Sequence, residues 1–248
     1  MDVGTARSAR SSSYRLGLSS LSLGAAPTCA ASVSSAEGRR SRRGVQKGGL
    51  DQAVARIAQS HPGAAVEVWA EDEARVGLLP LARRVWAKVG QRPRMSSRRR
   101  YQWRYVFAFV HPSSGRTEWV ITTTVSTGGM SAVLRHFAQL VGAGERRRIA
   151  LVIDGADWHT SNDPIVPEGI HLIFQPPYSP ELQPAEQLWP LLHEPLANRD
   201  FVDLDELEDV VGSRCCELSD QPALVQARTK FHWWPADRPS DQATHADS

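Results

Sequence analysis

Three carboxylates stand at places in the sequence where a fold could bring them together. Asp72 lies in VWAEDEARVGL, at the expected end of a strand, and Asp154 follows the apolar stretch ALVI. Glu186 lies in LQPAEQLW, at the expected start of a helix. Residues at the ends of neighbouring strands meet at one edge of a sheet, and the first turn of an abutting helix can reach that edge. The three acids are therefore candidates for a single site.

Such a site would suit a divalent cation. Carboxylates that are crowded together repel, so each one holds its proton more tightly, and a bound cation removes that penalty. Ligands that offer oxygen alone favour Mg²⁺ or Mn²⁺ over zinc. Two such ions about 4 Å apart can clamp the attacking and leaving oxygens of an in-line phosphoryl transfer. For each acid alone, a structural role is the alternative, because an acid in a first helical turn also favours the helix dipole.

The stretch around Glu186 is stiff. Residues 174–190 read FQPPYSPELQPAEQLWP and hold five prolines. Proline restricts the chain, so this loop could hold Glu186 in place before a metal arrives. The fourth proline suits the first turn of a helix, and two later prolines should kink that helix or end it early. Glu181 lies in the loop itself, and we expect it to be solvated.

The pattern of apolar residues predicts the frame that must position these acids. We expect strands at residues 64–73, 103–110, 116–125, 148–154 and 170–174. We expect helices at residues 50–59 and 126–141, near residue 184, and after a capping aspartate at residue 203. This order favours an α/β fold, with helices packed on a mixed sheet.

The composition is that of an ordinary globular chain of 248 residues, 41% of them hydrophobic and 23% charged. No apolar run is long enough to predict a membrane-spanning helix. The three cysteines have no CxxC spacing, so we expect neither a disulfide framework nor a structural zinc site. These features favour a reducing, cytoplasmic location.

A net charge of +2 conceals a basic stretch in the middle of the chain. Residues 83–104 hold nine basic residues and no acidic residue. Such a stretch could contact a polyanion such as DNA, and the alternative is a solvated, arginine-rich loop. The candidates for phosphate contacts are Arg83, Arg84, Lys88 and Arg92, with Trp86 as a packing anchor or a stacking surface.

Five stretches occur in this order: WAEDEARVGL, RRVWAKVGQRP, YVFAFVHPSSG, LVIDGADWHTS and IFQPPYSPELQPAEQLW. Together they resemble the bacterial insertion-sequence transposases related to the mariner group, which carry a DDE catalytic triad. The resemblance covers residues 66–189, half of the chain. It implies a ribonuclease H-like fold, which is a mixed sheet flanked by helices and agrees with the order of elements above.

The resemblance also implies a site and a reaction. Asp72 and Asp154 match the two aspartates of the family's triad, and Glu186 matches its glutamate. These residues would bind two Mg²⁺ (or Mn²⁺) ions, with Asp72 bridging them. Water would attack a phosphodiester at the transposon end, and the released 3′-hydroxyl would attack target DNA. The implied partners are DNA, both transposon ends and target, and a second copy of the chain, in the bacterial cytoplasm at the nucleoid.

Supporting roles follow at a few further positions. Glu73 could orient groups near Asp72, or it could point away, as strand neighbours do. His159 matches a family histidine and could touch the outer shell of the metals or the phosphate, with a structural role as the alternative. Trp189 is interpreted as a packing residue.

The sequence departs from the family at several positions. Gly155 stands where the family usually has asparagine, and Gln183 stands where it usually has asparagine before proline. The change at Gln183 could alter the turn that leads to Glu186. Pro190 and Pro195 interrupt a helix that the family continues with basic residues.

We expect three parts in the chain. Residues 1–49 are rich in Arg, Ser and Ala and should be disordered, without the helix-turn-helix modules that recognise element ends in the family. Residues 50–220 should form the catalytic domain, and residues 221–248 a loose tail. The expected function is a transposase catalytic domain that performs metal-dependent DNA cleavage and strand transfer. The alternative is a truncated, non-catalytic remnant that binds DNA or intact transposase without activity.

Overall fold

The computed structural model describes residues 49–90, 94, 100–154, 164–176 and 179–240. Within them, a five-stranded sheet has the order β3-β2-β1-β4-β5. Its strands are β1 (Ala65–Gly77), β2 (Trp103–His111), β3 (Arg116–Thr122), β4 (Arg147–Ile153) and β5 (Ile170–Phe174). β1, β2 and β3 pair antiparallel, whereas β4 and β5 run parallel to β1. The expected α/β class, a ribonuclease H-like mixed sheet flanked by helices, is confirmed.

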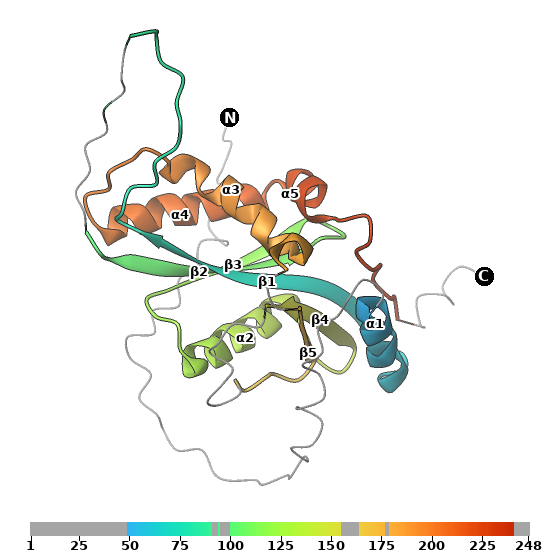
Figure 1. Ribbon diagram of the computed structural model, residues 1–248. Helices are drawn as coiled ribbons and strands as arrows, with labels where there is room; N and C mark the ends of the chain where they lie inside the picture. The colour runs from blue at the N-terminus through green and yellow to red at the C-terminus, as the bar shows by residue number, and fades with distance from the viewer. Residues whose placement is uncertain (1–48, 91–93, 95–99, 155–163, 177–178, 241–248) are drawn as a thin grey trace, which may run out of the picture.

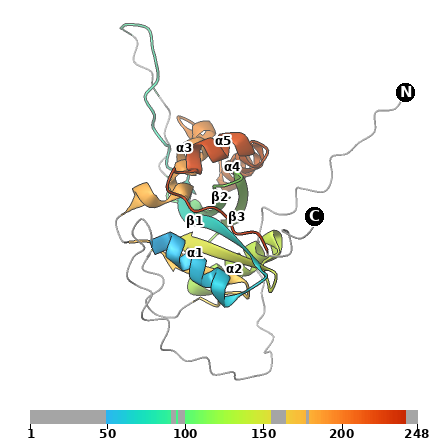
Figure 2. The same ribbon diagram turned by 90° about the vertical axis from the view of Figure 1, so that its right-hand side faces the viewer.

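Helices lie on both sides of the sheet (Figure 1, Figure 2). α2 (Thr127–Val141) covers one face, because its apolar residues recur at helical spacing and form one stripe. Trp69, Phe109 and Phe137 lie in the buried cluster under this helix. The rings of Phe109 and Phe137 stack with their centroids 4.0 Å apart. This packing fixes one face of β1, the central strand.

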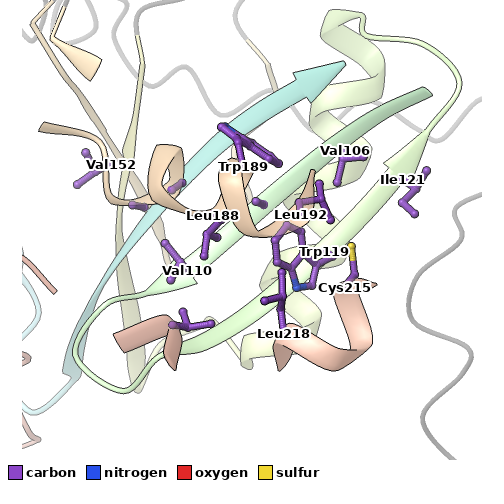
Figure 3. Close-up of a cluster of buried hydrophobic side chains, with 14 of the residues drawn as sticks. Val106, Val110, Trp119, Ile121, Val152, Leu188, Trp189, Leu192, Cys215 and Leu218 are labelled. Atoms are coloured by element: carbon purple, nitrogen blue, oxygen red, sulfur yellow. The ribbon is translucent and has the colours of Figure 1, made fainter. Parts of the chain in front are cut away.

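A second core lies on the opposite face of the sheet. Its helices are α1 (Gly49–Ser60), α3 (Trp189–Leu192), α4 (Leu204–Ser219) and α5 (Pro222–Thr229). Figure 3 shows Val106 and Val110 of the sheet in the same cluster as Leu192 and Leu218 of the helices. No described helix is long and apolar enough to cross a membrane.

β1 is longer than the sequence predicts, which corrects the expectation that Asp72 ends its strand. β2 pairs with residues 70–77 of β1, and these backbone hydrogen bonds carry the strand on to Gly77. β4, by contrast, pairs only with residues 65–70. Asp72 therefore lies within β1, just beyond the end of its pairing with β4.

The proline-rich loop leads into a series of short helical turns. These are η3 (Pro180–Leu182), η4 (Pro184–Leu188), the four residues of α3, and η5 (Glu194–Leu196). Proline lacks the N–H that a continuous helix needs, so each turn ends early. The helical run ends at Leu192, as the prediction of an early end has it, but Pro190 lies in the first turn of α3 and does not end the helix.

Most of the segment that was expected as a loose tail is packed on the domain. α5 starts at Pro222, and Val225 and Trp234 are buried in the core it shares with α4. Farther on, Arg238 pairs with Val66 of β1 through two backbone hydrogen bonds of 2.8 and 2.9 Å. The backbone of this segment pairs with an edge of β1 that β2 leaves open, which its polar sequence did not reveal. The expectations for residues 1–48 and 241–248 lie outside the described residues.

Candidate active site

The pairing of β1 with β4 places the two candidate aspartates side by side. The strands run parallel, with Ala70 opposite Val152 at the end of their pairing. Extended by two residues, this register would bring Asp72 opposite Asp154, with both side chains on the same face of the sheet. Asp154 directly follows β4 and is exposed.

Glu186 reaches the same region from η4, and Gln183 holds that turn against the sheet. Gln183 is buried, and its Nε2 donates a hydrogen bond of 2.9 Å to the backbone carbonyl of Glu71. Within the loop, Nε2 of Gln175 donates to the carbonyl of Leu182 at 2.8 Å. The residue that departs from the family pattern therefore ties the loop directly to the central strand.

Trp189, the first residue of α3, joins this loop to Asp72. Its Nε1 donates a hydrogen bond of 2.7 Å to Oδ2 of Asp72. The ring is buried and meets Trp119 edge to face, with ring centroids 6.4 Å apart (Figure 3). Trp189 thus packs, as the sequence interpretation has it, and also fixes the position of a candidate carboxylate. The two residues are far apart in sequence, so no local pattern signals this contact.

The three carboxylates share one electrostatic environment. Burial and the charges of Glu186 and Asp154 raise the pKa of Asp72 from 3.8 to about 7. The Trp189 N–H opposes this rise, because a hydrogen bond to the ionised carboxylate favours that form. Burial, followed by the charge of Asp154, also raises the pKa of Glu186. Acids from β1, from the end of β4 and from η4 therefore lie close enough to repel one another.

Two further acids flank Asp72 and point to the opposite face, because side chains alternate along a strand. Glu71 is 3% exposed, and burial raises its pKa well above the usual range, with the charges of Asp72, Glu73 and Asp154 adding to the effect. Burial and then Asp154 raise the pKa of Glu73. Oε2 of Glu73 is buried with no hydrogen-bond partner among the described residues. Glu71 was not predicted, although the run EDE at residues 71–73 was an available signal.

The donor set fits a hard divalent cation, although the side chains are not arranged as ligands. In the described part of the chain, no group of three or more His, Cys, Asp or Glu side chains could hold a metal ion as placed. The acids offer oxygen alone, which is the ligand type of Mg²⁺ and Mn²⁺. The raised pKa values of Asp72 and Glu186 mark a crowding of negative charge that a cation would relieve. These residues and Asp154 could hold a cation once their side chains turn toward it.

Residues 78–90, which follow β1 and which we call the arm, leave the sheet at the end of β1 (Figure 1). Arg84 and Lys88 are exposed on the arm. Trp86 is fully exposed, which corrects its suggested role as a packing anchor and leaves that of a stacking surface. The exposed basic and aromatic groups are those that a nucleic acid could contact.

Arg83, another candidate for a phosphate contact, is exposed and also bonds to the backbone of α3. The Nη2 of Arg83 donates to the carbonyl of Pro190 at 3.2 Å, so this arginine ties the arm to α3. His159 and Arg92 lie outside the described residues.

Comparisons with known proteins agree with the sequence interpretation. Residues 67–208 match the family described as DDE superfamily endonuclease. An uncharacterized protein of Sinorhizobium fredii (strain NBRC 101917 / NGR234) is 35% identical over 136 residues, which cover 53% of this chain and 96% of that protein. Among solved structures, the Mos1 mariner paired end complex with Mn has a TM-score of 0.43 at 16% identity, covering 84% of this chain and 67% of that chain. The catalytic domain of Mos1 mariner transposase has a TM-score of 0.37 at 14% identity, covering 75% and 93%.

Proposed function

The chain belongs to the DDE superfamily endonuclease family, and on that premise we propose that it is a transposase catalytic domain that cuts and joins DNA with the help of a divalent metal. The observation that carries the proposal is the shared environment of Asp72, Asp154 and Glu186. These acids come from three separate elements, and the fold brings their charges within reach of one another. Crowded carboxylates of this kind are costly in a folded protein unless a cation or a proton offsets them.

The residues of this chain would have distinct parts in the reaction. Mg²⁺ or Mn²⁺ ions held by Asp72, Asp154 and Glu186 would activate the attacking oxygen and neutralise the charge that develops on the phosphate. Asp72 must be ionised for this role, and the N–H of Trp189 favours that form. Gln183 holds the loop that carries Glu186 against β1.

Cleavage and joining would use the same site. In the first step, the oxygen of a water molecule forms a bond to phosphorus, and the bond to the 3′-oxygen breaks. In the second step, that 3′-hydroxyl attacks a phosphodiester of target DNA and displaces another 3′-oxygen. Both steps are in-line phosphoryl transfers that depend mainly on position and on charge neutralisation. The exposed Arg84 and Lys88 of the arm would contact the DNA backbone, in the bacterial cytoplasm at the nucleoid.

A second candidate function is that of a remnant that binds DNA or intact transposase without cutting. One observation favours it: the described His, Cys, Asp and Glu side chains, as placed, form no group that could hold an ion. The two functions differ in whether a cation draws Asp72, Asp154 and Glu186 together.

Calorimetric titration with Mn²⁺ separates the two functions. We expect the chain to bind Mn²⁺ and Asp154→Asn to lose that binding, with the titration repeated in the presence of DNA. Glu181→Gln is the matched control, because this acid is exposed in η3 and lies near Glu186 in sequence. Equal losses in Asp154→Asn and Glu181→Gln would indicate loose surface binding instead of a site.

A nicking assay on DNA with Mn²⁺ tests the triad itself. Asp72→Asn, Asp154→Asn and Glu186→Gln should each abolish nicking while circular dichroism shows an intact fold. A variant that nicks at the full rate would remove that residue from the triad. A chain that neither binds Mn²⁺ with DNA present nor nicks DNA would be the remnant.

A further inference from the structure

A small groove lies at the base of the arm, between the end of β1, η5 and the segment that leads to α4. It has a volume of about 110 Å³ and is lined by three basic side chains, Arg75, His193 and Arg199, beside Leu81, Leu196 and Phe201. None of these basic residues was among the candidates for DNA contacts in the sequence. The groove is separate from the exposed end of the arm that carries Arg84 and Lys88.

The walls of this groove are fixed by hydrogen bonds. Leu81 pairs with Ala197 as an isolated bridge, and the N–H of Asn198 donates to the carbonyl of Leu81 at 2.8 Å. Oδ1 of Asn198 accepts a hydrogen bond of 2.9 Å from the N–H of Arg83. Asn198 has a φ of 59°, a left-handed conformation that asparagine tolerates better than most residues. The arm and the segment after η5 therefore hold each other in place, and the groove is preformed.

The lining of the groove holds two arginines and no acidic residue. The guanidinium of Arg75 lies 4.9 Å from the ring centroid of Trp103, and no described carboxylate forms an ion pair with it. Arg199 lies 4.7 Å from the ring centroid of Phe201 and 3.4 Å from Glu206. Each guanidinium group lies over an aromatic ring, and that of Arg199 also contacts Glu206.

His193 adds a neutral donor to these charges. Burial, followed by the charge of Arg83, lowers the pKa of His193. The imidazole is then neutral near pH 7, and one ring N–H remains for donation. Two guanidinium groups and one N–H in a small space form a set of donors that matches an oxyanion.

The groove lies close to the candidate catalytic site. Arg75 follows Asp72 by three residues in β1, about 10 Å along the strand, and its long side chain leaves the strand on the same face as that of Glu73. α3 begins at Trp189, which bonds to Asp72, and is followed directly by His193. These four residues rise by about 6 Å. For a DNA strand that runs parallel to β1, with charges about 3.4 Å apart along the helix axis, the groove would lie about two to three nucleotides from a bond held at Asp72.

We propose that Arg75, His193 and Arg199 form a binding site for one backbone phosphate of the DNA, two to three nucleotides from the bond that is cut. This inference rests on the proposed function, because it takes the substrate of the carboxylate site to be DNA. The volume suits a phosphate group and is too small for a base pair. A phosphate contact fixes the position of the strand without reading its sequence. The groove therefore sets which phosphodiester reaches Asp72.

Salt-dependent DNA binding by the full chain, without divalent metal, tests the site. Each phosphate contact adds about 0.9 to the slope of log affinity against log salt concentration. We expect the double variant Arg75→Gln with Arg199→Gln to lower that slope by about 0.9 and to weaken binding about fivefold, equally on DNA of different sequences, and each single variant to lower the slope by a part of that amount. Arg135→Gln is the matched control, because Arg135 is exposed on α2, on the other face of the sheet. It should leave the slope unchanged.

Two further measurements keep the outcomes distinct. Asp72→Asn should still bind DNA and should fail to nick it. A slope that Arg75→Gln and Arg199→Gln leave unchanged would overturn the phosphate site, whether or not the chain nicks DNA. Conversely, nicking by Asp72→Asn would overturn the proposed function. The salt slopes of Arg75→Gln and Arg199→Gln would still show whether the groove binds a DNA phosphate. Inorganic phosphate should weaken DNA binding no more than sodium chloride does at the same ionic strength. A larger loss, absent in Arg75→Gln and Arg199→Gln, would identify a site for free phosphate and would overturn the backbone assignment.

Discussion

The indole Nε1 of Trp189 donates a hydrogen bond of 2.7 Å to Oδ2 of Asp72, which joins α3 to the central strand of the sheet. The bond favours the ionised form of Asp72, while burial and the neighbouring acids favour the protonated form. One side chain therefore links the packing of the helical core to the charge of the site.

Trp189→Phe keeps most of the buried ring and removes the N–H. We expect Asp72 to hold its proton more tightly, so that Mn²⁺ binding near neutral pH weakens about tenfold or more. A hydrogen bond to a charged group contributes about 1.5–3 kcal/mol, which is the basis of this magnitude. Calorimetry over a pH series should show the affinity of Trp189→Phe returning as the pH rises, which a purely structural defect would not produce.

Trp234→Phe provides the matched control. Trp234 is buried, and its Nε1 has no hydrogen-bond partner among the described residues. The substitution therefore replaces a buried indole with a smaller phenyl ring and removes no hydrogen bond. If Trp234→Phe weakened Mn²⁺ binding as much as Trp189→Phe, the bond to Asp72 would have no special role.

The metal-free protein should become less stable as the pH rises. The pKa of Asp72 is raised from 3.8 to about 7, so the folded state binds more protons than the unfolded state between these values. The free energy of unfolding must then fall as the pH rises through about 7, and the raised pKa values of Glu71 and Glu186 act in the same direction. Denaturant unfolding from about pH 5 to about pH 8 in a chelator would measure this slope.

Asp72→Asn removes one of the groups responsible for that slope. Its free energy of unfolding should fall less over the same pH range than that of the unchanged chain. A stability that rose with pH, or a slope that Asp72→Asn did not reduce, would contradict the crowding of charge at this site.

Much of the fold could be predicted because its elements have strong local patterns. The apolar period of α2 and the hairpin of β2 and β3 are confirmed. The length of β1 depends on β2, which residues 78–102 separate from it, so the local sequence did not set its end. The pairing of Arg238 with Val66 uses backbone groups alone, and such bonds leave no pattern of side chains to detect.

The candidate site was harder to predict than the fold. The positions of Asp154 and Glu186 followed from the apolar strand and the prolines around them. The bond from Trp189 to Asp72 and the bond from Gln183 to β1 are contacts between distant segments. Such contacts depend on how elements pack, which neither periodicity nor composition expresses.

Gln183→Ala should release the loop that carries Glu186. The substitution leaves the carbonyl of Glu71 without its buried donor, and an unmet buried group costs about 1–3 kcal/mol. We expect a loss of that size in urea unfolding and weaker Mn²⁺ binding. Gln187→Ala is the control, since Gln187 lies in the same turn but is only half-buried. Similar losses in the two variants would argue against an anchoring role for Gln183.

Gly115→Ala tests how closely α5 packs against the hairpin turn. Gly115 has a φ of 75°, and a Cβ there would lie 1.9 Å from the carbonyl oxygen of Pro222. Gly63→Ala is the control, because Gly63 has a φ of 84° with no atom near its Cβ position. Both variants bear the left-handed strain of about 1–2 kcal/mol. Thermal unfolding should show a larger loss for Gly115→Ala, because α5 must also move, and equal losses would show that α5 packs loosely.

The contact between Arg238 and Val66 also bears on how the chain is made. Val68 donates its N–H to Asp237, 169 residues later in the sequence. During synthesis, β1 therefore emerges from the ribosome long before the segment around Arg238 that covers its open edge. During that interval the edge can pair with a strand of another nascent chain. The strand that is synthesised first is thus completed last, and the rate of translation sets how long that edge remains open to aggregation.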